Sequence, residues 1–178
     1  MGRSSSLRSD GAGNDFPAEV TKAWEPATEA VEAHGLRRVV GRIGVVLSND
    51  GGAFPQMVLP FRLFAGGPIG SGKQWLSWVH IADVVAAIRT FIEDPTTSGV
   101  YNICAANPIT NKEFGKTIGK ALWRPAFAPA PAFVMKLLFG EMSTLLLEGQ
   151  RVLPQRLEQA GFDFQYTTAE AAVTALLS

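Results

Sequence analysis

One stretch, residues 75–87, constrains the fold more than any other part of the chain. Trp75, Ser77 and Val79 alternate with two further apolar residues, which is the two-residue period of a short strand. Beyond it, apolar residues recur at helical spacing; they are Val84, Val85, Ala87, Ile88 and Phe91. The sequence therefore predicts a strand that leads directly into a helix.

Two polar residues lie at this predicted junction. His80 occupies the position of an N-cap, and Asp83 places a carboxylate in the first helical turn, where the helix dipole is positive. On the structural interpretation, Asp83 caps the helix and His80 packs in the core. On the functional interpretation, the end of the strand borders a cleft.

The composition excludes several classes of function. The chain has 178 residues, enough for one compact domain or slightly more, and its sixteen basic and sixteen acidic residues cancel, which argues against nucleic acid or an acidic membrane as a partner. A single cysteine, Cys104, and two histidines support no disulfide and no metal site. No apolar run reaches the roughly 18 residues of a spanning helix. We expect an intracellular, soluble protein, either cytoplasmic or organellar (plastid stroma or mitochondrial matrix).

The amino-terminal region divides into an arm and a helix. Residues 1–14 are rich in Ser, Gly and Arg, which predicts a flexible arm; a cloning remnant and the end of a transit sequence are both compatible with it. Asp15 can cap a following helix with Pro17 in its first turn, and Pro26 should end or bend that helix.

A β-branched run over Leu36–Leu47 predicts a buried parallel strand. Residues 49–52 (Asn-Asp-Gly-Gly) predict a turn, and residues 54–64 a helix. The glycine-rich loop over residues 65–73 ends in Gly-Ser-Gly-Lys, which is similar to the end of a phosphate-binding loop. Its order is wrong for that motif, because Gln74 and a strand follow Lys73 where a Ser or Thr and a helix are required.

The remaining chain carries clear local signals. Residues 99–104 predict a strand, and Thr110 with Glu113 forms a capping box for a helix through Leu122. A proline-rich connector covers residues 123–131. An apolar helical tail follows from Ala132, and Gly161 ends its last helix before an extended aromatic segment and a final helix over 168–177.

Two segments resemble a known family. Residues 78–114, WVHIADVVAAIRTFIEDPTTSGVYNICAANPITNKEF, are similar to the substrate-domain segment of extended short-chain dehydrogenases, the sugar-nucleotide epimerase and dehydratase group. Residues 129–166, PAPAFVMKLLFGEMSTLLLEGQRVLPQRLEQAGFDFQY, resemble a narrower family of epimerase-like proteins with a short C-terminal domain of unknown function. The resemblance covers about residues 14 to 176.

This resemblance implies an α/β fold: a remnant of a Rossmann-type parallel sheet plus the smaller helical α/β substrate domain. We expect a flexible arm over 1–14, the C-terminal remnant of the Rossmann domain over 15–50, a substrate-domain segment over 51–124 and the helical C-terminal family domain over 125–178.

The resemblance also implies a cofactor, NADP or NAD, and the residues near it. The end of the 36–47 strand would lie beside the nicotinamide; the implied cofactor contacts are Gly44, Val45, Val46 and Leu47, with Val46 acting through its backbone. The implied substrate-cleft residues are Gly66, Gly67, Gln74, Trp78 and His80.

The motifs that would complete such an enzyme are missing from the sequence. There is no Gly-x-x-Gly-x-x-Gly turn with its flanking strand and helix, and the residues before the first helix are too few for one βαβ unit. Lys22 has Ala18 four residues before it, where the family's Tyr-x-x-x-Lys places tyrosine, so Lys22 is interpreted as a surface residue that could still touch a cofactor ribose. No catalytic residue is assigned, and the chain alone is not expected to bind the cofactor.

Two hypotheses follow. The chain is either the C-terminal portion of an NAD(P)-dependent epimerase or oxidoreductase, or a non-catalytic structural or assembly subunit, a pseudoenzyme within a larger complex. In the first, the catalytic half is a separate chain or is not included in this sequence. The 36–47 strand would be an apolar strand without neighbours, which favours the second and predicts a protein partner.

Overall fold

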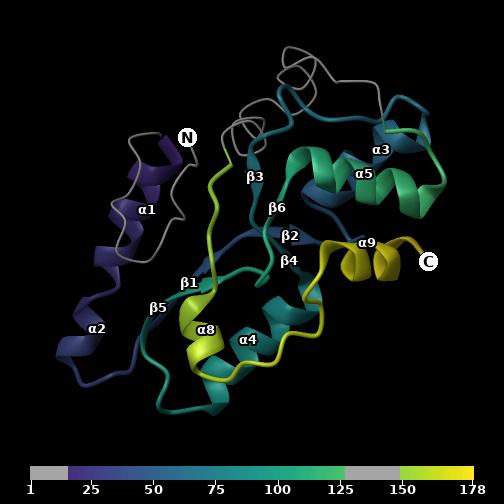
Figure 1. The fold of residues 1–178 in the computed structure, drawn as a ribbon. Helices are drawn as coiled ribbons and strands as arrows, with labels where there is room; N and C mark the ends of the chain where they lie inside the picture. The colour runs from purple at the N-terminus through teal and green to yellow at the C-terminus, as the bar shows by residue number, and fades with distance from the viewer. Residues whose placement is uncertain (1–15, 127–148) are drawn as a thin grey trace.

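A computed structural model of the chain describes residues 16–126 and 149–178 (Figure 1). The helices are α1 (Phe16–Ala27), α2 (Ala30–Ala33), α3 (Ala53–Arg62), α4 (Ile81–Glu93), α5 (Asn111–Leu122), α8 (Gln155–Gln159) and α9 (Ala169–Leu177). The strands are β1 (Val39–Ile43), β2 (Val45–Leu47), β3 (Trp75–Leu76), β4 (Trp78–His80), β5 (Gly99–Ile103) and β6 (Ile109–Thr110). This mixture of helices and short strands confirms the predicted α/β class.

The strands pair as three short two-stranded sheets. β1 runs parallel to β5, and β2 runs parallel to β4. β3 and β6 pair antiparallel. Parallel strands need a crossover between them: α3 lies in the connection from β2 to β4, and both α3 and α4 lie in the connection from β1 to β5.

The prediction of one buried strand over Leu36–Leu47 is wrong in three respects. The strand is broken at Gly44, where the Gly44 amide donates to the carbonyl of Ile103 (3.0 Å) and the next amide, of Val45, donates to the carbonyl of Ser77 (2.8 Å). The run therefore has two neighbours, β5 and β4, instead of none. It is also only partly buried, since the last three residues of β1 are exposed.

The predicted strand over residues 75–79 is likewise two strands. It breaks at Ser77, so that β3 pairs with β6 while β4 pairs with β2. The predicted junction with a helix is confirmed, because β4 ends at His80 and α4 begins at Ile81. His80 is the N-cap, and its Nδ1 accepts a hydrogen bond from the Ala82 amide (3.1 Å).

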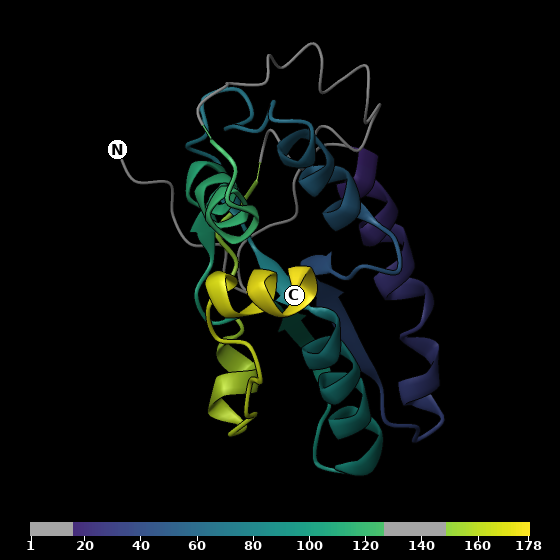
Figure 2. The same cartoon turned by 90° about the vertical axis from the view of Figure 1, so that its right-hand side faces the viewer.

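Two apolar clusters form the core. In the first, α3, α5 and α9 pack on the β2 and β4 strands, with Phe54, Trp78 and Phe114 fully or almost fully buried. Figure 2 shows α9 between α5 above and α4 below, and Figure 1 agrees. In the second, the buried face of α4 packs against β5 and α8, which brings together Val84, Ala87, Phe91, Tyr101, Ile103 and Leu157.

Asp83 does not cap its helix as predicted. Its side chain is 1% exposed, and its two carboxylate oxygens accept hydrogen bonds from the backbone amides of Gln165 (2.7 Å) and Tyr166 (3.1 Å). The aromatic segment between α8 and α9 is thereby fixed against the start of α4. The ring of Tyr166 stacks on His80 with 3.9 Å between ring centroids.

Most purely local predictions are confirmed. The capping box of Thr110 and Glu113 begins α5, which ends at Leu122, and the Thr168 hydroxyl caps α9. Gly161 has a φ of 73° just after α8, the left-handed conformation that ends helices. The predictions of a cap at Asp15 and of apolar helices between residues 132 and 148 lie outside the described residues.

Replacing Asp83 with asparagine should weaken the fold. Asparagine offers one acceptor oxygen, and its amino group would face the second backbone amide, so that one buried donor is left unpaired. We expect Asp83→Asn to lower the free energy of unfolding by about 1–3 kcal/mol. Urea unfolding followed by circular dichroism measures the change. Asp163→Asn, at an exposed neighbouring position, is the control and should unfold like the unchanged chain. Equal losses in the two variants would contradict a stabilising role for the Asp83 hydrogen bonds.

Candidate functional site

The implied cofactor edge, residues 44–47, lies where the chain passes from β1 into β2. Val45 and Val46 are half-buried and Leu47 is fully buried. Within β2, Val45 pairs with Trp78 and donates its amide toward β4, so the backbone groups of Val46 point away from β4. Val46 is thus the one residue of β2 whose backbone faces away from its paired strand. Its role as a cofactor contact stays a prediction.

Gly44 is required at this edge by the close approach of another strand. A Cβ atom on residue 44 would overlap the carbonyl oxygen of Ser77 and would lie 3.3 Å from the Cβ of Cys104. Because the main obstacle is backbone rather than a flexible side chain, any other residue would push β4 away from β2.

Three of the implied cleft residues are buried with hydrogen-bond partners inside the protein. Gln74 donates to the carbonyl of Ile69 (2.9 Å), the Trp78 indole donates to the carbonyl of Asn107 (3.1 Å), and His80 caps α4. Gln74, Trp78 and His80 are 7%, 0% and 7% exposed, so little of their surface is accessible to a ligand. The structure therefore places them in the core next to the predicted edge, and their assignment to a substrate cleft stays a prediction.

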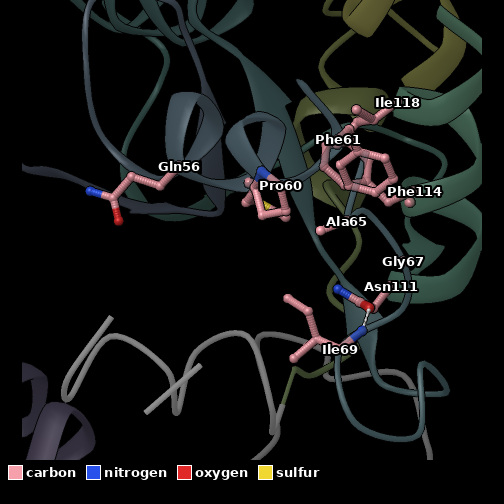
Figure 3. A pocket seen from close by; sticks show the side chains of 11 residues that line it. Gln56, Pro60, Phe61, Ala65, Gly67, Ile69, Asn111, Phe114 and Ile118 are labelled. Atoms are coloured by element: carbon pink, nitrogen blue, oxygen red, sulfur yellow. Dashed lines mark hydrogen bonds between the residues drawn. The ribbon is translucent and has the colours of Figure 1, made fainter. Parts of the chain in front are cut away.

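The two implied glycines lie in the loop between α3 and β3. Gly66 packs against the ring of Phe61, with no room for a side chain. Gly67 lines a small hollow between α3, α5 and this loop (Figure 3). The loop is followed by β3 and not by a helix, which agrees with the rejection of a phosphate-binding loop.

This hollow is mainly apolar and has one buried polar side chain. The Asn111 carbonyl oxygen accepts the Ile69 amide (2.8 Å), while its nitrogen points toward the hollow (Figure 3). The cavity volume is about 30 Å³, enough for a water molecule and too small for a sugar or nucleotide. The hollow is therefore not a substrate cleft by itself.

Burial sets the ionisation of two groups near the edge. It lowers the pKa of His80, an effect that the nearby Asp83 charge partly offsets. It raises the pKa of the Cys104 thiol to about 12, with a further contribution from the charge of Glu158. Cys104 is thus a protonated, buried thiol at neutral pH, which does not suit a nucleophile.

Sequence reasoning missed two residues beside the edge. The Ser77 hydroxyl donates to the carbonyl of Gln150 (2.7 Å) and accepts from the amide of Val152 (2.8 Å), which brings Arg151 next to Trp75. These contacts join positions more than 70 residues apart, so no spacing in the sequence indicates them.

Lys22 is exposed, as predicted. Within residues 16–126 and 149–178, no helix is long and apolar enough to cross a membrane.

Parallel strands with helices in the connections between them are the arrangement of an α/β protein, the class to which Rossmann-type folds belong. The profile of the NAD dependent epimerase/dehydratase family matches residues 21–104, and that of a domain of unknown function, DUF1731, matches residues 130–176. The chain belongs to this epimerase family, in the group that carries this C-terminal domain.

Similar proteins are longer than this chain. The epimerase family protein YfhF of Bacillus subtilis is 42% identical over 164 residues, which are 92% of this chain and 54% of that protein. A chloroplastic homolog of epimerase family protein SDR39U1 in Arabidopsis thaliana is 43% identical over 166 residues, 93% of this chain and 48% of that protein. The chain therefore spans about half the length of these relatives.

A solved relative contains a cofactor. The crystal structure of human epimerase family protein SDR39U1 (isoform 2) with NADPH superposes with a TM-score of 0.86 at 39% identity, covering 96% of this chain and 58% of that one. The similarity extends over nearly all of the present chain.

Replacing Gly44 with alanine should separate β2 from β4. Overpacking against backbone typically costs about 1–3 kcal/mol, and we expect Gly44→Ala to lower the free energy of unfolding by that amount. Gly115→Ala, on α5, is the matched control, because a Cβ atom there lies at an ordinary 3.5 Å from its nearest neighbour, the ring of Phe61 on α3. Thermal unfolding of both variants tests this, and a Gly44→Ala midpoint at or above that of the control would overturn it.

Stability should fall as the pH drops below that at which unfolded histidine protonates, about 6.5. The folded pKa of His80 is lowered, so between the two values the unfolded chain binds more protons and stability rises with pH. His80→Asn keeps a side-chain acceptor at the N-cap without titrating. Urea midpoints at pH 7.5, 6.0 and 5.0 should show a smaller pH dependence in this variant; identical slopes would exclude His80 as the source.

Proposed function

We propose that this chain forms the substrate side and the nicotinamide edge of an NADP(H)-binding epimerase-family protein. The glycine-rich Rossmann half would be supplied by further sequence of the same polypeptide or by a separate chain. The observation that supports this proposal most directly is the unpaired edge of β1, which leads directly into Gly44–Leu47.

The open edge follows from the hydrogen bonds of β1. The carbonyl of Arg38 accepts the Gly99 amide (2.8 Å), and the Gly44 amide bonds to Ile103 on the same neighbour, β5. Backbone groups alternate in direction along a strand, so Val39 and Ile43 present theirs on the opposite side. None of the described strands pairs with that side, and Ile43 is 49% exposed. An edge of this kind accepts another strand.

A second unpaired surface supports the same proposal. The face of α4 opposite the core carries an apolar row at helical spacing, consisting of Ile81, Val85, Ile88 and Ile92, with exposures of 36%, 59%, 44% and 73%. Contiguous apolar surface of this kind usually marks an interface. A Rossmann half that extends the sheet beside β1 would bring its own helices toward such surfaces.

The cofactor assignment rests on the family and on the human relative crystallised with NADPH. Bound NADPH supplies a hydride. From this chain, the backbone of Val46 would border the nicotinamide, and Leu47 and Trp78 would support it from the core. Ala18 stands where the family has tyrosine, so the proton-transfer group would have to come from outside this chain.

The competing function is that of a structural subunit. It is favoured by the same exposed surfaces, together with Trp24 and Trp123, which are 70% and 91% exposed. A partner unrelated to dehydrogenases could cover them equally well.

Native mass spectrometry of the assembly purified through this chain, combined with NADPH titration, separates the two. We expect a component or segment with the glycine-rich turn, and NADPH binding by the assembly with no binding by the isolated chain. An assembly of unrelated proteins that fails to bind NADPH would establish the structural role and refute the proposal. Tight binding by the isolated chain would show that no Rossmann half is required.

A further inference from the structure

The segment over residues 149–153 is fixed across the break between β3 and β4. Ser77 anchors it through the two hydrogen bonds to Gln150 and Val152, and the side chain of Asn102 donates to the carbonyl of Leu153 (3.3 Å). Gly149 approaches Trp75 so closely that a Cβ atom would overlap the Trp75 carbonyl oxygen. The backbone on both sides of Arg151 is therefore held in place.

Among the described residues, Arg151 has an aromatic neighbour and no hydrogen-bond or ion-pair partner. Its guanidinium carbon lies 5.2 Å from the centroid of the Trp75 ring, a cation–π contact. Its Nε is buried and donates to no acceptor in residues 16–126 or 149–178. In the described part of the chain, no carboxylate forms an ion pair with it, whereas Arg38, Arg42 and Arg89 each pair with a glutamate.

A buried guanidinium donor without an acceptor is unfavourable, because the group has lost water and gained nothing in exchange. The missing partner should be planar or tetrahedral with two oxygens, since the guanidinium fork binds carboxylate and phosphate through paired hydrogen bonds. The Trp75 ring restricts the orientation of the guanidinium without using its donors.

The position of Arg151 connects it to the cofactor edge. Ser77 holds the Arg151 segment through its hydroxyl, and it accepts the Val45 amide through its carbonyl. One residue therefore separates the guanidinium-bearing segment from the strand that the proposed function places beside the nicotinamide.

We propose that Arg151, stacked on Trp75, binds the oxyanion of a small-molecule ligand, a phosphate or carboxylate group, close to residues 44–47. The location in a substrate cleft rests on the proposed function; the oxyanion site itself rests on this chain alone. Arg151 contacts the ligand directly and fixes its anionic end.

The test is a titration of the full chain with inorganic phosphate and, separately, with acetate, followed by the ¹H–¹⁵Nε signals of the arginine side chains. We expect the Arg151 signal to move and saturate, and the signal of Arg62, an exposed arginine on α3, to stay in place. A stronger response to phosphate than to acetate identifies the phosphate class, and the reverse identifies the carboxylate class. An unmoved Arg151 signal, or equal drift at Arg62, would overturn the proposal.

Variants distinguish binding geometry from charge. Arg151→Lys keeps the charge but loses the fork, and Arg151→Gln loses both; we expect phosphate to bind roughly tenfold more weakly to the first and undetectably to the second. Arg62→Gln is the control and should bind like the unchanged chain. Backbone amide spectra confirm that each variant is folded. Phosphate binding at Arg151 without NADPH binding in the assembly would refute the proposed function and leave this site intact.

Discussion

The rest of the structure depends on the contact between Gly44 and the carbonyl of Ser77. At this point the chain stops pairing with β5 and begins to pair with β4, because the Gly44 amide bonds to Ile103 at the end of β5 and the Val45 amide bonds to Ser77 just before β4. The contact is possible because residue 44 has no side chain. It links the parallel pair β1–β5 to the parallel pair β2–β4. Ser77 then uses its hydroxyl to fix residues 149–153, which extends the same junction to a third segment.

Much of the fold follows from signals within a few residues. The capping box at Thr110, the caps at His80 and Thr168, and the left-handed Gly161 all appear where the sequence predicts them, because each involves only neighbouring backbone groups. Strand continuity could not be predicted in this way. An apolar β-branched run has the same sequence pattern whether all its residues pair with one strand or the pairing changes from one strand to another halfway along. Here the change depends on the carbonyl of Ser77, which is 32 residues from the Val45 amide that it accepts.

The candidate site was predicted less well, for a related reason. The family resemblance assigns Gln74, Trp78 and His80 to a cleft, yet each finds its hydrogen-bond partner inside the protein. Residue type does not distinguish a polar group that holds a loop from one that holds a ligand. Conversely, Arg151 gives no signal in the sequence, because its isolation is a property of three-dimensional neighbours. The same limit applies to Asp83, whose hydrogen-bonded partners lie 82 and 83 positions away.

The way in which Asp83 holds the aromatic segment has a consequence for how this region can vary. Its carboxylate bonds to main-chain amides, so these hydrogen bonds depend on the path of the backbone and not on the side chains of the residues that donate them. The two hydrogen bonds to Asp83 therefore require only an amide hydrogen at residues 165 and 166, which excludes proline at both positions, while the stacking of Tyr166 on His80 constrains the side chain at 166 separately. Insertions and deletions between α8 and α9 are a different matter, since one extra residue would displace the amide pair from the carboxylate. The length of this connection is thus more tightly constrained than its composition.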